Sequence, residues 1–138
     1  MRLLTLLLIT TSLVSADDHF DFQPYTYKAE VLSVYDADTV TLNIDLGLNV
    51  HTKQKLRLYG INAPEVRGVE RTEGLKSRNA LREWIPVGST LIVRTHKDKQ
   101  GKYGRYVGTL YRKNSKGRLV DLNKQLVQQG YAKFHDYD

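Results

Sequence analysis

The chain has 138 residues, of which 41% are hydrophobic and 26% are charged, as is ordinary for a globular protein. This length suffices for one domain but not for two domains with sizeable cores. Lysine and arginine outnumber the acidic residues, and the formal net charge of +6 favours a polyanionic partner. Because there is no cysteine, disulfides, a thiolate nucleophile and a cysteine-based zinc site are excluded.

The N-terminal residues have the pattern of a signal peptide. Arg2 precedes an apolar run over residues 3–13, and the small residues Val14-Ser15-Ala16 follow where a signal peptidase would cut. The apolar run is shorter than an ordinary membrane span. We therefore expect residues 1–16 to be removed, so that the protein is secreted or periplasmic and has no membrane partner. An uncleaved N-terminal anchor is the alternative.

A flexible, acidic lead-in is expected over residues 17–24, followed by a single domain over residues 25–138. The first part of this domain alternates between apolar and polar residues, which is typical of strands. The clearest case is the second strand, in which Val40, Leu42, Ile44 and Leu46 face one way. The strands are predicted at residues 25–35, 39–46 and 50–59.

The second part of the domain mixes helical and strand patterns. Thr72 is a plausible N-cap for the first helix, and Asp121 caps the second, which Gly130 would end. The predicted elements are a helix over residues 75–85, a strand over 90–95, a loop over 97–104, a strand over 105–112 and a helix after 121. This order predicts a mainly β protein with helices. Its fold would be a five-stranded Greek-key barrel of the oligonucleotide/oligosaccharide-binding (OB) type, with one helix between strands 3 and 4 and another after strand 5.

Polar groups gather at the end of the third predicted strand, in the stretch from Arg57 to Glu65. Gly60 relaxes the backbone there and Pro64 restricts it, so the strand ends in a shaped loop. An arginine fork suits a phosphate, whereas a carboxylate beside oxygen ligands suits a hard metal ion or a water to be deprotonated. Taken alone, this stretch could equally be a surface strand followed by a polar turn.

Matching groups elsewhere in the chain favour phosphodiester hydrolysis. Glu65 could accept the proton of an attacking water, and Arg57 and Arg105 could bind the phosphoryl oxygens as negative charge develops. A hard cation could be held by Asp38, the side-chain oxygen of Asn62 and a backbone carbonyl.

Three blocks of residues resemble the signature of the staphylococcal nuclease (thermonuclease) family. They are Asp36-Ala37-Asp38-Thr39-Val40, residues 57–65 and Lys102-Tyr103-Gly104-Arg105, and their order and approximate separations match over about residues 25–133. The resemblance implies a calcium-dependent nuclease on an OB-type barrel. Such an enzyme cuts both DNA and RNA, with little sequence specificity, to products ending in 3′-phosphate.

The resemblance also implies a role for each matching residue. Arg57 and Arg105 match the catalytic arginines of the family, and Glu65 matches its proposed general base. The implied calcium ligands are Asp38, Asn62 and the backbone carbonyl of Ala63, and the implied contacts to a terminal phosphate are Lys102 and Tyr103.

The sequence departs from the family pattern in two places. Asn62 stands where an aspartate ligand is usual, so we expect weaker calcium binding or another divalent metal, because ligand charge tunes calcium affinity. Asp136 and Asp138 stand where base-stacking aromatic residues are expected, and Tyr137 is one residue out of register. The sequence as given stops at Asp138, before the position of the final helix of the best-known members. No stacking role is therefore assigned to this tail.

The sequence thus predicts an exported, monomeric nuclease acting on DNA and RNA. One alternative is an OB-fold module that binds nucleic acid without cleaving it, which Asn62 favours. Another is a barrel that binds carbohydrate or protein, which the basic charge and the two arginines disfavour. A basic cluster around the first helix is either a solvated face or a surface that steers nucleic acid; it comprises Arg67, Arg71, Lys76, Arg78 and Arg82.

Overall fold

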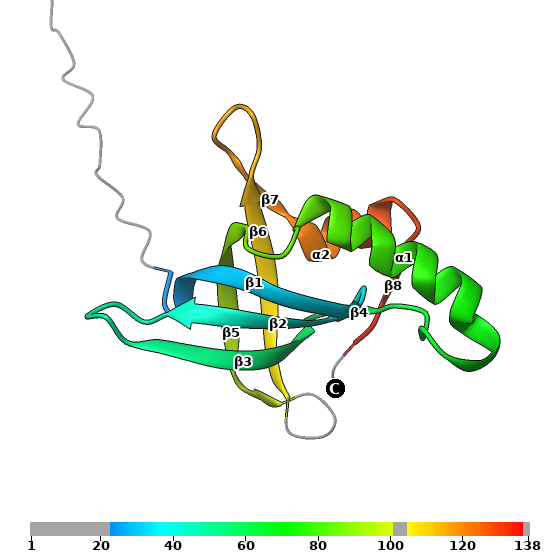
Figure 1. Cartoon of the computed structure of the whole chain (residues 1–138), viewed down its shortest axis with the longest axis horizontal. Helices are drawn as coiled ribbons and strands as arrows, with labels where there is room; N and C mark the ends of the chain where they lie inside the picture. The colour runs from blue at the N-terminus through cyan, green and yellow to red at the C-terminus, as the bar shows by residue number, and fades with distance from the viewer. Residues whose placement is uncertain (1–22, 101–104, 137–138) are drawn as a thin grey trace, which may run out of the picture.

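The computed structural model describes residues 23–100 and 105–136 (Figure 1). The predicted signal peptide, residues 1–16, lies outside the described residues. The strands are β1 (Thr26–Asp36), β2 (Thr39–Asp45), β3 (His51–Leu58), β4 (Ile61–Asn62), β5 (Thr90–Gln100), β6 (Tyr106–Lys113), β7 (Leu119–Asp121) and β8 (Lys133–Phe134). The helices are the short 3-10 helix η1 (Gly68–Glu70), α1 (Arg71–Trp84) and α2 (Leu122–Gln128).

Five of these strands close into a barrel, in the order β3-β2-β1-β5-β6 (Figure 1). Neighbours in this order are antiparallel, and the barrel closes where β3 runs parallel to β6 from Leu56↔Tyr106 to Leu58↔Gly108. The helix α1 lies between the third and fourth barrel strands, and α2 follows the fifth. The predicted mainly β, OB-type barrel is confirmed.

The core is built by the alternation seen in the sequence. Leu56 and Leu58 of β3, and Val40 and Leu42 of β2, are each fully buried inside the barrel. Burying apolar side chains of this size is the main favourable term in folding. The helix α1 adds a buried face against the barrel, and Trp84 at its end is partly buried against the core.

The second helix is pinned to the barrel by a buried amide. Asn123 donates to the carbonyls of Tyr59 and Gly108 at 3.0 and 3.2 Å, and accepts from the N–H of Leu110 at 3.1 Å. These bonds satisfy backbone groups at the seam between β3 and β6. The predicted cap is confirmed, since the Asp121 carboxylate accepts from the N–H of Lys124 at 3.0 Å.

Several elements differ from the prediction. The helix α1 begins at Arg71, four residues before the predicted start, and β2 ends at Asp45, so Leu46 is exposed rather than in the core. Thr72 is not the N-cap, because η1 leads directly into α1 and Glu70 holds the cap position without a capping side-chain bond. Strand β5 continues to Gln100 through a region predicted as loop, because it pairs with β6 at Gln100↔Tyr106. The short strands β4, β7 and β8 were not predicted, since two or three residues cannot display an alternating pattern.

Within residues 23–100 and 105–136, no helix has the length and apolar character needed to cross a bilayer.

Candidate active site

The turn between β1 and β2 carries two buried carboxyl groups. The Asp36 side chain accepts the N–H of Asp38 at 3.0 Å, which closes the turn. Asp36 and Asp38 are only 5% and 2% exposed. Burial, reinforced by the neighbouring Asp38 carboxyl, raises the pKa of Asp36 to about 7. The turn therefore presents Asp38 as its main negative charge, with Asp36 readily protonated beside it.

Asp38 is the hub of the site. Its Oδ2 accepts from the N–H of Ala63 at 2.7 Å and forms an ion pair with Nη1 of Arg57 at 2.5 Å. Its Oδ1 accepts from the hydroxyl of Thr39 at 3.1 Å, and its backbone carbonyl accepts from Leu58 N–H at 2.8 Å. A buried carboxylate is tolerated only with this degree of pairing.

Arg57 connects this carboxylate to the loop that follows β3. Its Nη2 donates to the side-chain oxygen of Asn62 at 2.8 Å and to the carbonyl of Ile61 at 3.2 Å. The Arg57 side chain is only 13% exposed. Because β4 also pairs with β8 at Asn62↔Lys133, the loop that presents Asn62 is held on both sides.

Arg105, the residue directly before β6, is linked to the same carboxylate. Its Nη1 donates to the hydroxyl oxygen of Thr39 at 3.1 Å, and the Thr39 hydroxyl in turn donates to Asp38. Two guanidinium groups that are 48 residues apart in sequence therefore flank one buried carboxylate. Thr39 makes this connection and was not predicted as a site residue, although it lies in the block that contains Asp38.

Glu65 is held through its backbone. Its N–H donates to Oε2 of Glu70 at 2.9 Å, and its side chain is exposed at the surface. A Cβ built on Gly74 of α1 would lie 2.0 Å from the Glu65 carbonyl oxygen. Gly74 is the fourth residue of α1, and only a residue without a Cβ permits this approach. The predicted helix began at residue 75, so neither Gly74 nor Glu70 was indicated by the sequence.

The structure thus brings together Asp38, Arg57, Asn62, Ala63 and Arg105, with Glu65 two residues beyond Ala63 on the same loop. The other two predicted site residues, Lys102 and Tyr103, lie outside the described residues. In the basic cluster, Arg82 donates to the carbonyl of Val34 at 2.9 and 3.2 Å, so part of that cluster attaches α1 to β1.

The chemistry of the candidate ligands fits a hard divalent cation. Asp38, Asn62 and Ala63 offer a carboxylate, an amide oxygen and a carbonyl, which are calcium ligand types, and their contacts bring them to one place. Their charge is low, because Asp38 is the single carboxylate among them and is paired with Arg57. Within the described parts of the chain, no group of three or more histidine or acidic side chains could hold a metal ion.

The model of one protein family, described as staphylococcal nuclease homologue, matches residues 55–138. The matched segment includes Arg57, Glu65 and Arg105, whereas Asp38 precedes it. No curated protein matches the sequence.

Proposed function

The chain belongs to the staphylococcal nuclease homologue family, and from this premise we propose that it is a secreted, metal-dependent nuclease. Family membership indicates that the domain is a nuclease or a nucleic-acid-binding module. The proposed reaction is hydrolysis of phosphodiester bonds in DNA and RNA, with little sequence preference, to products ending in 3′-phosphate. Little preference is expected because the site offers groups that address phosphate rather than base edges.

The single observation that carries this proposal is the pair of arginines around Asp38. Arg57 contacts the carboxylate directly and Arg105 contacts it through Thr39, so both guanidinium groups are oriented before any substrate binds. Such preorganised donors stabilise the charge that develops on phosphoryl oxygens in the transition state. A barrel that only binds carbohydrate or protein would have no need for this arrangement.

Each proposed catalytic residue then has a distinct task. Glu65 removes the proton from the attacking water, and its exposed carboxylate is accessible to that water. Arg57 and Arg105 bind the phosphoryl oxygens and assist departure of the leaving oxygen. Lys102 and Tyr103 are proposed to contact a terminal phosphate of the substrate.

Calcium is the proposed cofactor, with Asp38, Asn62 and the Ala63 carbonyl as its protein ligands. When bound, it would polarise the phosphate and supply positive charge beside the two arginines. The neutral Asn62 lowers the ligand charge, so another divalent metal could replace calcium.

We also propose export, with residues 1–16 acting as a signal peptide, and a monomeric state. The sequence pattern of Arg2, the apolar run and Ala16 supports the first part of this proposal. The mass of the protein recovered from culture medium or periplasm would test cleavage after Ala16, and light scattering would test the monomer.

A non-cleaving nucleic-acid-binding module is the second candidate. Asn62 favours it, because loss of a charged ligand weakens the metal site. The two proposals differ in what they require of Glu65, since binding alone needs no general base.

The decisive experiment is cleavage of single-stranded DNA as a function of calcium concentration, with a chelator control. The Glu65→Gln variant should lose about 10²–10³-fold or more in turnover while keeping its oligonucleotide affinity, since general base catalysis is worth about 10²–10⁴-fold. Magnesium and manganese are tested in parallel. Binding without cleavage in all three metals would instead establish the non-cleaving module.

A further inference from the structure

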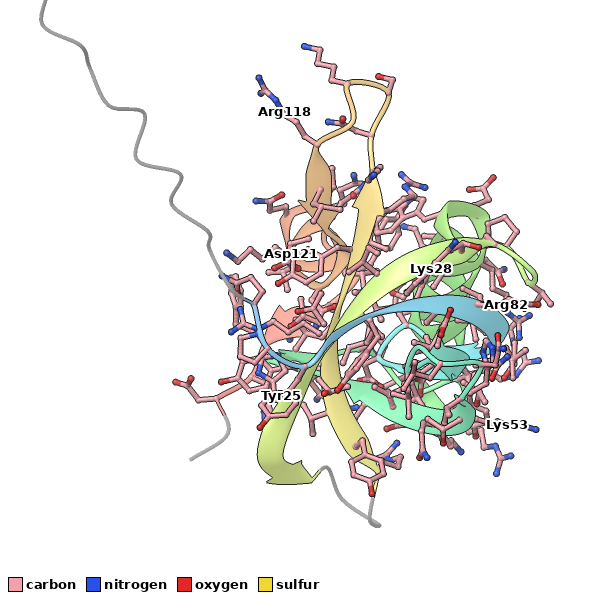
Figure 2. The ribbon with its side chains drawn as sticks, turned by 90° about the vertical axis from the view of Figure 1, so that its left-hand side faces the viewer. Tyr25, Lys28, Lys53, Arg82, Arg118 and Asp121 are labelled. Carbon is pink, nitrogen blue, oxygen red and sulfur yellow. The ribbon has the colours of Figure 1, made fainter. Side chains whose placement is uncertain are left out.

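The outer face of β3 carries a row of exposed side chains, two of them lysines, that leads to Arg57. In this strand the side chains of His51, Lys53 and Lys55 are exposed, and Arg57 follows them on the same face. Figure 2 shows Lys53 projecting outward from the barrel. The row does not contribute to the core, and the proposed roles of the catalytic residues do not use it.

The neighbouring strand lines this row with neutral polar groups. Thr41 lies opposite Lys55, and Asn43 lies opposite Lys53, in the antiparallel register of β2 and β3. Directly opposite residues of a sheet share a face, so these side chains form the floor beside the lysines. The next opposite pair is Asp45 and His51, and its carboxylate marks the acidic end of the row.

An exposed aromatic side chain stands next to the row. Tyr35 is 42% exposed, and the Nζ atom of Lys55 lies 5.2 Å from the centre of its ring. This is a cation–π contact between β1 and β3 across the outer face. An exposed tyrosine ring beside a row of cations is the combination that proteins use to bind single-stranded nucleic acid, with phosphates on the cations and a base on the ring.

In the described part of the chain, one edge of β3 has no paired strand over most of its length. Strand β3 pairs with β2 from His51 to Arg57, but with β6 only from Leu56 onward. Within residues 23–100 and 105–136, no strand pairs with the other edge of β3 between His51 and Lys55. The exposed side chains of Lys53 and Lys55 beside this unpaired edge are therefore accessible to a ligand.

We propose that Lys55, Lys53 and Tyr35 form a binding track for single-stranded nucleic acid that extends the candidate active site. The inference rests on the proposed function, since it takes Arg57 to hold the phosphate at which cleavage occurs. Lys55 and Lys53 bind the next two phosphates along the strand, and Tyr35 stacks on a base. The track ends at Asp45, whose charge repels a further phosphate.

The spacing of the lysines supports this assignment. Residues two apart in a strand are separated by about 6.6 Å, because the rise is about 3.3 Å per residue. This distance is comparable to that between successive phosphates of an extended single strand. A duplex holds its phosphates on a rigid helical path, so the track should favour single-stranded over double-stranded substrate.

Lysines on an open strand edge have another common use, which is to prevent edge-to-edge aggregation. Glutamate at the same positions keeps a charge on the edge but repels phosphates. The test variant is therefore Lys53→Glu/Lys55→Glu. The matched control is Lys113→Glu/Lys116→Glu, which changes the charge equally on the exposed β6–β7 hairpin at the top of Figures 1 and 2.

The experiment compares steady-state cleavage of a dinucleotide and an eight-nucleotide oligothymidylate by the full chain. For the longer substrate, Lys53→Glu/Lys55→Glu should raise KM about tenfold or more at low salt, because two phosphate contacts are lost, with kcat unchanged. Its kinetics on the dinucleotide should match wild type. Tyr35→Leu should raise KM for the longer substrate about fivefold or more, since stacking is worth about 1–3 kcal/mol per base.

Each outcome has a separate meaning. Equal KM values for the track variant and its hairpin control would overturn the track, and so would an equal effect on the short and long substrates. If wild-type protein neither binds nor cleaves either oligonucleotide, the proposed function itself fails and the track fails with it. A stable Lys53→Glu/Lys55→Glu protein with the expected KM change would establish the track and exclude edge protection as its sole role.

Discussion

The arginine side of the candidate site and the Glu65 loop are held in place by different kinds of contact. Arg57 and Arg105 are oriented through side chains, by Asp38 and by the Thr39 hydroxyl. Glu65 is held through its backbone. Its N–H donates to Glu70, and its carbonyl packs closely against Gly74, which has no Cβ, while the Glu65 carboxylate is exposed.

This difference fits the tasks that we propose for the two regions. Groups that stabilise developing charge act best when they are already fixed, because reorienting them during the reaction would cost free energy. A general base must instead reach a water molecule, so its carboxylate has to remain accessible. The comparison predicts that substitutions on the arginine side change charge balance and stability together. Substitutions near Glu65 should act through backbone position.

The largest effect is expected for Arg57→Ala. The variant should lose about 10²–10³-fold in kcat/KM, the typical cost of one preorganised donor. It should also be destabilised by about 3–5 kcal/mol, because Asp38 would stay buried without its counter-charge. Cleavage assays and urea denaturation measure the two effects. Arg57→Lys keeps the positive charge but not the bidentate guanidinium. It should therefore restore more of the lost free energy of unfolding than of the lost cleavage rate. Full activity in Arg57→Ala would remove the arginine from the mechanism.

Gly74→Ala tests the backbone side of the comparison. In an exposed helix this change stabilises by about 1 kcal/mol. Here we expect the opposite sign, about 1–3 kcal/mol of destabilisation, because the added methyl group would collide with the Glu65 carbonyl. Turnover should fall as the loop shifts. The control is Asn79→Ala in the exposed part of the same helix, which should fold and cleave like wild type. A stabilised, active Gly74→Ala protein would refute the close approach.

The pH dependence of stability tests the buried carboxyl groups on the arginine side of the site. The pKa of Asp36 is raised from 3.8 to about 7 on folding, so the folded protein holds a proton that the unfolded chain releases. The contribution of protonated Asp36 to the free energy of unfolding is complete below about pH 4, and it is lost as pH rises through about 7. In chelator, Asp36→Asn should therefore gain about 1–3 kcal/mol over wild type between pH 5 and 8. Denaturation midpoints that keep a constant difference over this range would contradict the expectation.

The smallest effect is expected for Asn62→Asp. The change adds one negative charge beside the proposed calcium ligands, where a unit charge at a protein surface is worth about 1–4 kcal/mol. The added ligand charge should make calcium bind about tenfold more tightly. The gain is limited to this size because Arg57 neutralises part of the new charge. Calorimetric titration of wild type and variant measures this directly. Unchanged affinity would show that position 62 is not a ligand.

The sequence determined the barrel. Period-two alternation located β1, β2 and β3, and the caps at Asp121 and Gly130 located α2, because these signals depend on neighbouring residues only. The order of elements then indicated the OB-type topology. The site residues could be proposed because three short blocks resemble a known family.

The tertiary structure alone decided how those residues meet. The ion pair of Arg57 with Asp38, and the link from Arg105 through Thr39, join residues that are far apart in the chain. The same holds for the extension of β5 to Gln100, which follows from its pairing with β6. Local sequence patterns do not predict such contacts, because the free energy of these contacts comes from burial and pairing that exist only once the barrel has closed.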